Sequence, residues 1–360
     1  MLILQMLAQG HRVDIFTYAN GVVEMQDYFK KHRTYGKQVK IYDIPGLTLE
    51  FHGAKLSLFK TVTGNVKHFI AWQKTYAKQV AAIIRQEQYA LFVIDFEFFF
   101  SRLAHKLHGH ALQVQISSSQ AAIAHGTLGL PADLKKRYLT AFNRMFVRMY
   151  QPRPDKAFIT SFYRPETLNS YAQFMGPVLR SEVLDAKRVD KKFILTYIKP
   201  TIEDQVFPVV EELAQQEKRP FVVYVNDPGK YHARTLTKYI RLKKTSLSGD
   251  FLKDLINCTA VIGTAGIELP SEAIYLEKPM FGIIESGQWE QGINGYYIEK
   301  VGLGLSAESD TMTVEILSKF LDAIPQFKKS VLRYKNQMPI GSLTIPKILA
   351  SYLPKNKKRK

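Results

Sequence analysis

The segment formed by residues 259–304 constrains the fold of this chain more than any other part of the sequence. Its apolar run at residues 260–262 predicts a buried parallel strand, because such strands are covered on both faces and read as continuous hydrophobic runs. The strand ends in the turn 263–266. A helix is expected to start near Pro270, since Pro, Ser and Glu are all favoured in a first helical turn. A strand, a glycine turn and a helix in this order predict one unit of a parallel α/β fold.

The same segment predicts a ligand site at the end of the strand. Backbone N–H groups at a helix start favour an anion such as a diphosphate, and Gly266 would let that anion approach the backbone closely. Glu272 could accept hydrogen bonds from ribose hydroxyls, and polar side chains after the next expected strand, at 279–284, could bind a hexose. The alternative is two ordinary strand–helix turns whose glycines serve packing alone. The candidate residues are Thr264, Ala265, Gly266, Ser271, Glu272, Gln288, Glu290, Gln291 and Asn294.

Two sequence patterns stand on these successive strand–helix units. They are G-x-x-x-x-S-E, from Gly266 to Glu272, and G-Q-x-E-Q-x-x-N, from Gly287 to Asn294. Together they resemble the donor half of GT-B glycosyltransferases, in particular the bacterial group similar to MurG. The resemblance is clear over residues 176–305 and weaker over residues 1–160. A single glycine turn would be weak evidence, whereas an ordered pair on neighbouring units is much more specific.

The resemblance implies an α/β fold of the GT-B type, in which two Rossmann-like domains face each other across a cleft. We expect a first domain over residues 1–175, a second over residues 176–340, and a C-terminal helix with a basic tail over residues 341–360. The second domain would bind the nucleotide sugar, with UDP as the nucleotide by analogy with relatives. The resemblance implies no cofactor. No Asp-x-Asp metal motif is present, so we expect catalysis without a metal ion.

Acidic residues occur where the first domain should meet an acceptor. An apolar strand at 91–94 is followed by Asp95 and Glu97, at the edge where open α/β sheets bind ligands, and relatives show the same Asp-Phe-Glu sequence. The resemblance implies inversion, with a base on the first domain that deprotonates the acceptor hydroxyl and usually lies in a loop this chain lacks. Asp95 and Glu97 are therefore candidate catalytic residues that orient the acceptor or assist the base. The alternative is that they only cap the following helix.

The first residues depart from the pattern of relatives, which begin with a strand, a glycine-rich loop and a helix before the sequence A-x-G-H-x-V. Here only that last element is present, at residues 8–13, after a helix expected at residues 2–9. We therefore expect that the first strand of the N-terminal domain is missing and that the natural chain starts upstream of Met1. The alternative is a genuine loss of this strand, which would leave a gap in the sheet. His11, at a helix–strand junction, is not expected to replace the loop histidine.

The charge predicts an anionic partner, because 50 Lys and Arg residues stand against 32 Asp and Glu residues, a formal net charge of +18. No nucleic-acid-binding module is recognisable, so we expect no nucleic acid partner. We favour an anionic membrane surface as the partner, because the sequence contains basic amphipathic segments and a basic tail. The segments are one or two helices expected at 57–88 and a single helix expected at 131–150, and the tail is 355–360. The alternative is an ordinary solvated surface. The single cysteine, Cys258, is expected to be buried and suits a cytoplasmic protein, peripheral on the inner face of the cell membrane.

The sequence thus predicts a glycosyltransferase that moves a hexose-type sugar from a UDP donor to an acceptor, for which the basic surface favours a lipid-linked molecule. Two alternatives remain open at this point. One is a UDP-sugar 2-epimerase, which shares the architecture and the nucleotide site and needs no acceptor. The other is a non-catalytic basic protein that binds a nucleotide sugar or a membrane.

Overall fold

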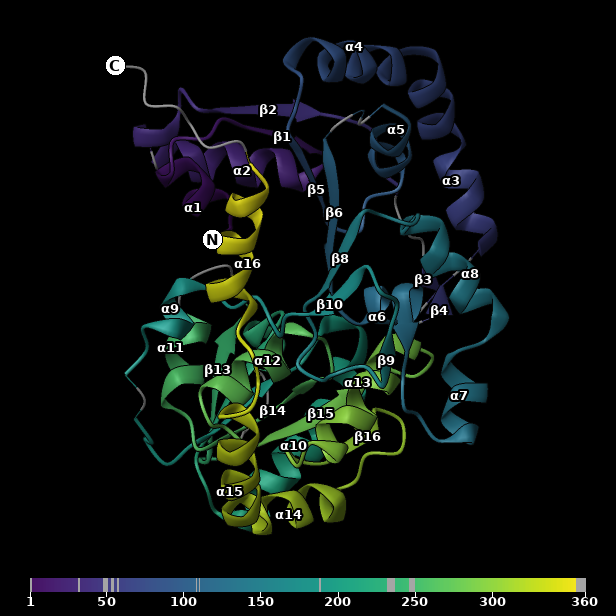
Figure 1. Ribbon diagram of the computed structural model, residues 1–360. Helices are drawn as coiled ribbons and strands as arrows, with labels where there is room; N and C mark the ends of the chain where they lie inside the picture. Colours follow the sequence, from purple (N-terminus) through teal and green to yellow (C-terminus); the bar gives the residue numbers. More distant parts are fainter. Residues whose placement is uncertain are drawn as a thin grey trace.

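The computed structural model describes residues 2–31, 33–47, 51–52, 55–56, 58–107, 109, 111–187, 189–231, 237–245 and 250–353. Figure 1 shows two halves, each with its own sheet, and C-terminal helices that run along one side of both. Within the described residues, no helix combines the length and the apolar character needed to cross a membrane.

The second half is built on a six-stranded parallel sheet. In sheet order its strands are Ile240–Lys244 (β13), Phe221–Val225 (β12), Ile194–Tyr197 (β11), Ala260–Thr264 (β14), Met280–Ile284 (β15) and Ser306–Glu308 (β16). The chain runs from β11 outward to β13 and then returns to add β14, β15 and β16 on the other side of β11. In doubly wound sheets of this kind, ligands bind at the carboxyl ends of the strands beside such a reversal.

Both faces of this sheet are buried, as the continuous apolar run at residues 260–262 predicts. All five residues of β14 are buried, and their side chains alternate between two cores. Val261 packs beside Leu195 on one face, whereas Ile262 packs beside Phe281 on the other. The strand is therefore fixed on both sides, and the turn that follows it has a rigid base.

Helices cover both faces of the second sheet, and the C-terminal helices continue along the molecule. Ala273 and Ile293 are buried in one core, and Val206 and Leu317 are buried in the other. The helices are Ser181–Leu184 (α9), Glu203–Glu217 (α10), Asp250–Asn257 (α11), Glu268–Tyr275 (α12), Trp289–Lys300 (α13), Val314–Asp322 (α14), Ile324–Lys335 (α15) and Gly341–Tyr352 (α16).

The first half contains two separate parallel sheets. The four-stranded sheet is Ala172–Phe174 (β10), Lys156–Ile159 (β8), Leu112–Ser117 (β6) and Leu91–Ile94 (β5), and the pair is Val13–Thr17 (β1) with Val39–Asp43 (β2). Among the described residues, no backbone ladder joins β1 to β5. Side chains connect them instead: the Tyr89 hydroxyl donates to Asp14 at 2.5 Å, and the Phe16 and Phe100 rings stack 4.7 Å apart. The parallel strands of the first half are thus divided between two sheets in the part of the chain that the structure describes, and the missing first strand stays a prediction.

The first half contains eight α-helices among the described residues, and one of the expectations for them is wrong. They are Leu2–Ala8 (α1), Asn20–Lys31 (α2), Leu58–Ala71 (α3), Ala77–Glu87 (α4), Phe99–Leu107 (α5), Ser119–His125 (α6), Ala132–Tyr138 (α7) and Ala141–Tyr150 (α8). The segment 57–88 forms α3 and α4 around a π-helical turn, Trp72–Tyr76. The single helix expected at 131–150 is wrong. Thr140 is extended and its hydroxyl accepts from Asn143 N at 3.1 Å, and such a cap starts a new helix.

The chain crosses between the halves twice, and the two crossings are bonded to each other. Gly341 N donates to the Pro177 carbonyl at 2.9 Å. The Ser342 hydroxyl accepts from Leu179 N and donates to the Leu179 carbonyl at 2.8 Å. These bonds fix the relative position of the two connecting segments.

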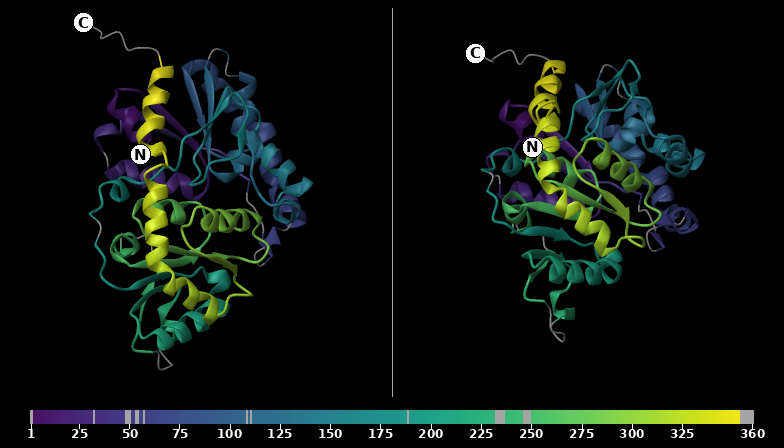
Figure 2. Two further views of the ribbon diagram at one scale, coloured as in Figure 1. Left: turned by 60° about the horizontal axis from the view of Figure 1, so that its bottom comes forward. Right: turned by 90° about the horizontal axis from the view of Figure 1, so that it is seen from below.

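After the second crossing, α16 packs with the first half. Both views of Figure 2 show α16 in yellow beside the N-terminus, and α16 contacts α1. Its Ile345 and Leu349 are buried in one core with Val114 of β6. The division into residues 1–175, 176–340 and 341–360 remains a proposal, to which we add that α16 belongs spatially with the first half.

A buried histidine makes the first half sensitive to acid. His125 Nε2 donates to Gln115 Oε1 at 2.8 Å, and burial lowers the pKa of the ring to about 4. The unfolded chain binds this proton near pH 6.5, so the stabilisation is complete above pH 6.5 and is lost as the pH falls towards 4. Urea unfolding at pH 7 and pH 4.5 should show a loss of up to about 3 kcal/mol from this group. His125→Gln serves as the control. An equal acid dependence in both proteins would contradict the prediction.

Candidate active site

A cavity of about 1510 Å³ lies at the carboxyl ends of β11, β14 and β15, beside the strand reversal. Its volume exceeds that of most single-ligand pockets, so two ligands can share it. Ala265 is fully buried, and the Ser271 hydroxyl donates to the Ile267 carbonyl at 2.6 Å. Neither of these two is among the residues that line the cavity. The other seven ligand residues predicted from the second half line it, namely Thr264, Gly266, Glu272, Gln288, Glu290, Gln291 and Asn294.

The turn between β14 and α12 presents backbone rather than side chains to the cavity. A Cβ atom added at Gly266 would meet no protein atom within 4 Å, so internal packing does not require a glycine there. Ile267, at the N-cap of α12, makes no side-chain cap hydrogen bond. This geometry favours close approach of a ligand over the packing alternative, and the helix start adds a positive dipole end.

Glu272 is held by an arginine from the segment that joins the halves. Arg180 Nε donates to Glu272 Oε1 at 2.6 Å, and Arg180 Nη2 donates to Oε2 at 3.0 Å. The Glu272 side chain is 7% exposed and that of Arg180 is 46% exposed. A carboxylate has about four lone-pair positions, so the pair still leaves Glu272 able to accept from a ribose.

A second polar cluster lies at the end of β15, and the sequence analysis did not identify it. Glu285 accepts from Lys199 Nζ at 2.6 Å, from the Thr201 hydroxyl at 2.6 Å and from Gln291 Nε2 at 2.7 Å. The Lys199 ammonium lines the cavity. The interactions of these groups hold the pKa of Glu285 below its ordinary value, although burial opposes them. The cluster therefore places a fixed ion pair, Lys199 with Glu285, at the cavity wall.

The amide residues on α13 are already engaged within the protein. Gln291 Oε1 accepts from Glu285 N at 2.8 Å, and Asn294 Nδ2 donates to the Ala265 carbonyl at 3.0 Å. Asn294 is fully buried, and its Oδ1 has no hydrogen-bond partner in the structure. Gln288 and Glu290 stand at the start of the helix and line the cavity. Binding of a sugar by these four residues stays a prediction.

One wall of the cavity is aromatic. Tyr197 and Tyr224, at the ends of β11 and β12, both contact Phe251 edge-on, with ring centroids 5.5 Å and 5.2 Å apart. All three rings line the cavity. Such a wall suits the flat face of a nucleobase.

Asp95 of the first half is not among the residues that line the cavity, but its carboxylate interacts electrostatically with one of them. Burial raises the pKa of Asp95 to about 6, and the negative charge of Glu268 contributes. Glu268 begins α12 and lines the cavity, so Asp95 lies within electrostatic range of the start of that helix. The residue as a whole is nevertheless exposed, so water screens much of this effect.

Glu97 has the capping role that the sequence analysis gives as its alternative. Its carboxylate accepts from Phe99 N at 3.0 Å, from Phe100 N and from Ser101 N at 3.2 Å, all at the start of α5. Phe96, between the two acidic residues, has φ = 41°. This left-handed conformation costs free energy in a residue with a side chain, and such strain is concentrated at functional sites. The strained residue holds Asp95 outward while Glu97 turns back to the helix.

The contacts that the sequence analysis missed join residues far apart in the chain. Arg180 and Glu272 are 92 positions apart, and Lys199 and Glu285 are 86 positions apart. For the pair Lys199 and Glu285, the sequence did contain one indication that Lys199 belongs to the site. Lys199 and Thr201 directly follow an apolar strand, as Thr264 does, and parallel strands end at one edge of a sheet.

Solved glycosyltransferase structures share the fold of this chain. The kitacinnamycin glycosyltransferase gives a TM-score of 0.66 at 14% identity, with 98% of this chain and 94% of that chain covered. CalG4, the calicheamicin glycosyltransferase, gives 0.65 at 12% identity, with 99% and 94% covered. UGT89C1 of Arabidopsis thaliana, complexed with UDP-L-rhamnose, gives 0.67 at 10% identity, with 98% and 94% covered. At these identities the likeness establishes the fold, which is that of the GT-B glycosyltransferases.

The sequence identifies the family to which the chain belongs. Residues 1–325 match Glycosyl transferase family 1, and the chain belongs to that family. No curated protein matches the sequence. The GT-B resemblance stated from the two sequence patterns is thus confirmed, and the closer relationship to the MurG group stays a prediction.

Proposed function

We propose that the protein transfers a hexose-type sugar from a UDP donor to a hydroxyl group of an acceptor, with inversion and without a metal ion. One observation carries the proposal: the open Gly266 turn at the start of α12 lines the large cavity, and the Asp95 carboxylate of the first half is within electrostatic range of Glu268 on the same helix. A candidate anion site of one half and a carboxylate of the other half are thus close to each other. This is the arrangement that a donor and an acceptor need in order to meet.

The donor would lie along the second half. Its diphosphate rests on the Gly266 turn, with the Lys199 ammonium nearby to offset its charge. Its ribose hydroxyls donate to Glu272, and its base packs against Tyr197 and Phe251. The hexose then extends towards α13, where Gln288, Glu290, Gln291 and Asn294 gather.

In the transfer step, the acceptor oxygen forms a bond to the anomeric carbon while the bond from that carbon to the phosphate oxygen breaks. The electron pair of the broken bond leaves with UDP. Backbone N–H groups and the dipole of α12 stabilise this charge as it develops. The acceptor loses its hydroxyl proton to a base, and Asp95, ionised above about pH 6, accepts a hydrogen bond from the hydroxyl and orients it. Attack from the side opposite the nucleotide inverts the anomeric centre.

The protein would work in the cytoplasm, at the inner face of the cell membrane, on a lipid-linked acceptor. The net charge of +18 supports contact with an anionic surface. Cys258 is buried, as predicted, and burial raises the pKa of its thiol to about 12, so it supplies no nucleophile to the reaction.

Donor binding and turnover test the proposal together. UDP, UDP-glucose, UDP-galactose and UDP-N-acetylglucosamine are titrated by calorimetry, and UDP release is followed with and without a lipid extract as the source of acceptor. We expect binding of UDP and release that depends on the extract. No binding of any of these compounds at millimolar concentration would overturn the proposal. Formation of UDP and a sugar inverted at C2, without any acceptor, would identify a 2-epimerase instead.

A further inference from the structure

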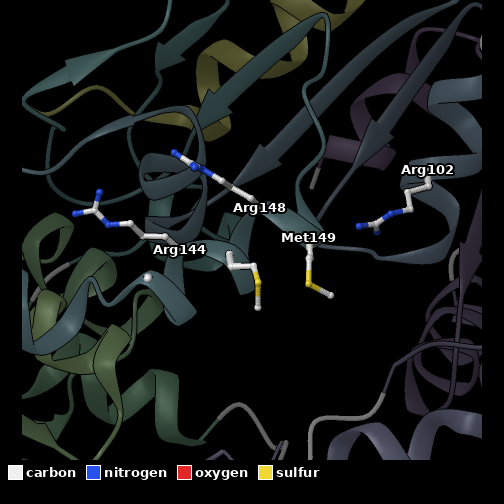
Figure 3. A pocket seen from close by; sticks show the side chains of 6 residues that line it. Arg102, Arg144, Arg148 and Met149 are labelled. Atoms are coloured by element: carbon white, nitrogen blue, oxygen red, sulfur yellow. The ribbon is translucent and has the colours of Figure 1, made fainter.

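A cavity of about 500 Å³ on the first half lies away from the donor site and is lined by arginines and methionines. Its lining residues on α8 recur at helical spacing, at positions 141, 144, 145, 148 and 149, and Arg102 of α5 faces them. Figure 3 shows Met149 between Arg102 on one side and Arg144 and Arg148 on the other. The cavity therefore combines cationic groups with apolar thioethers.

The methionines are exposed although they are large and apolar. The Met145 residue is 53% exposed and the Met149 residue is 40% exposed. Methionine side chains are flexible and adapt to irregular apolar surroundings, and an exposed apolar patch rimmed by polar groups marks an interaction site. The cavity thus has an apolar floor that is available to a partner.

The same surface continues onto α3. Val66, Phe69 and Ile70 of that helix are exposed. The Phe69 ring contacts the Phe98 ring at 5.8 Å, and the Arg102 guanidinium lies 4.0 Å above the same Phe98 ring. Figure 1 shows α3, α5 and α8 on one side of the first half. We call this surface, formed by the exposed side chains of these three helices, the α3–α5–α8 face.

The charge of this face has one sign. None of the three helices contains an Asp or a Glu, and their Lys and Arg residues are Lys60, Lys67, Arg102, Lys106, Arg144 and Arg148. Arg102 Nη1 donates to the Phe98 carbonyl at 3.1 Å, and Arg144 Nε donates to the Leu139 carbonyl at 3.0 Å. Because each guanidinium has five N–H donors, these bonds hold the side chains in place and leave donors for a phosphate.

The face adjoins the acceptor side of the cleft. Phe96, which follows Asp95, stacks on Tyr150 of α8 with ring centroids 4.6 Å apart, and Phe98 contacts the same tyrosine at 5.3 Å. Aromatic contacts therefore connect the residue that follows Asp95 to α8 of this face. A partner bound on this face lies next to the carboxylate that is proposed to orient the acceptor.

We propose that the α3–α5–α8 face docks on a lipid bilayer that contains acidic phospholipids. Arg102, Arg144 and Arg148 bind lipid phosphates, and Met145 and Met149 enter the space between the headgroups. Charge complementarity selects this occupant, since a continuous cationic rim around exposed apolar side chains matches an anionic headgroup layer over hydrocarbon. The inference deepens the proposed function by giving a lipid-linked acceptor a route to Asp95, but docking itself requires no sugar transfer.

Vesicle co-sedimentation tests the docking. The vesicles contain phosphatidylcholine alone or equal parts of phosphatidylcholine and phosphatidylglycerol, and the salt concentration is varied. We expect binding to the acidic vesicles only, weakening as salt shortens the range of electrostatic attraction. Replacing Arg102, Arg144 and Arg148 together by Gln should weaken this binding by about 100-fold, since each basic group near such a surface contributes about fivefold.

A matched control removes the same number of charges from the other half of the molecule. Lys319, Lys329 and Arg333 lie on α14 and α15, and their joint replacement by Gln should leave vesicle binding within about threefold of wild type, a difference small beside the loss expected at the face. A second variant, M145S with M149S, keeps all charges and should reduce the binding that persists at high salt. Thermal unfolding and UDP calorimetry confirm that each variant is folded.

The outcomes separate docking from sugar transfer. Equal losses in the face variant and the control variant would assign binding to net charge and overturn the proposal. Failure to bind vesicles, with binding to a mixed-sequence RNA instead, would assign the face to nucleic acid and also overturn it. If acidic vesicles bind as expected while UDP and its sugars do not, the docking proposal stands and the proposed function fails. If UDP and its sugars bind while acidic vesicles do not, docking is rejected and the proposed function remains in place.

Discussion

Asp95→Asn is expected to lower the turnover number by about 10²- to 10⁴-fold, the usual contribution of a group that handles the proton of a reacting hydroxyl. The substitution keeps the shape of the side chain and removes its charge. Wild-type activity should fall as the pH drops below about 6, because burial and Glu268 raise the pKa of Asp95 to that value and only the ionised form accepts the hydrogen bond. UDP release measured from pH 5 to pH 8 checks both expectations.

Glu97→Gln is the control for this experiment. The Glu97 carboxylate caps α5, so this variant should lose stability by about 0.5–2 kcal/mol and keep the acid limb of the pH profile. An Asp95→Asn variant with wild-type turnover and an unchanged acid limb would remove Asp95 from the reaction. Orientation of the acceptor hydroxyl would then fall to another group of the first half.

Glu272→Ala is expected to weaken UDP binding by about 10- to 150-fold, which corresponds to 1.5–3 kcal/mol for hydrogen bonds to a charged group. The variant removes the carboxylate proposed to accept the ribose hydroxyls. Its stability should change little, because the Arg180 side chain is 46% exposed and can turn to water once its partner is gone. Calorimetry with UDP and with uracil locates the loss, since uracil carries no ribose and should bind both proteins equally.

Arg180→Gln serves as the comparison for Glu272→Ala. We expect it to lower the stability of the protein more than its affinity for UDP. The substitution leaves the Glu272 carboxylate, which is 7% exposed, without its ionic partner, and because that partner is half-exposed the loss of stability should be about 1–3 kcal/mol, the cost of a buried polar group left unpaired. Urea unfolding and UDP calorimetry therefore distinguish the two residues. Unchanged UDP affinity in the Glu272→Ala protein would reduce Glu272 to a partner of Arg180.

The second half could be predicted from sequence largely because its strands are buried on both faces. An apolar run such as 260–262 leaves few choices for its place in a sheet, and Gly266 and Glu272 then follow at the expected edge. The first half was harder. The split at Thr140 depends on one hydroxyl that accepts from Asn143 N, and an amphipathic pattern that continues across the break does not reveal it.

Contacts between elements that are distant in the sequence could not be predicted from the sequence patterns, for a different reason. Local periodicity shows which side of an element is buried, but it does not show what lies opposite. A Cβ atom added at Gly292 of α13 would come within 2.2 Å of the Tyr138 ring of α7. This glycine follows Gln291 in a pattern that was interpreted entirely as sugar binding, and the structure shows that it also lets the two halves approach each other.

The return of α16 to the first half has a consequence for synthesis on the ribosome. Ile345 and Leu349 complete a core with Met6 and Phe158, although the residues of this core are separated by nearly the whole chain. Domains generally fold in the order in which they are translated, but this core remains open until its last side chains have been made. The second half has all of its strands by residue 308 and can assemble while the first half still exposes apolar surface. The part of the chain that is synthesised first therefore completes its core last.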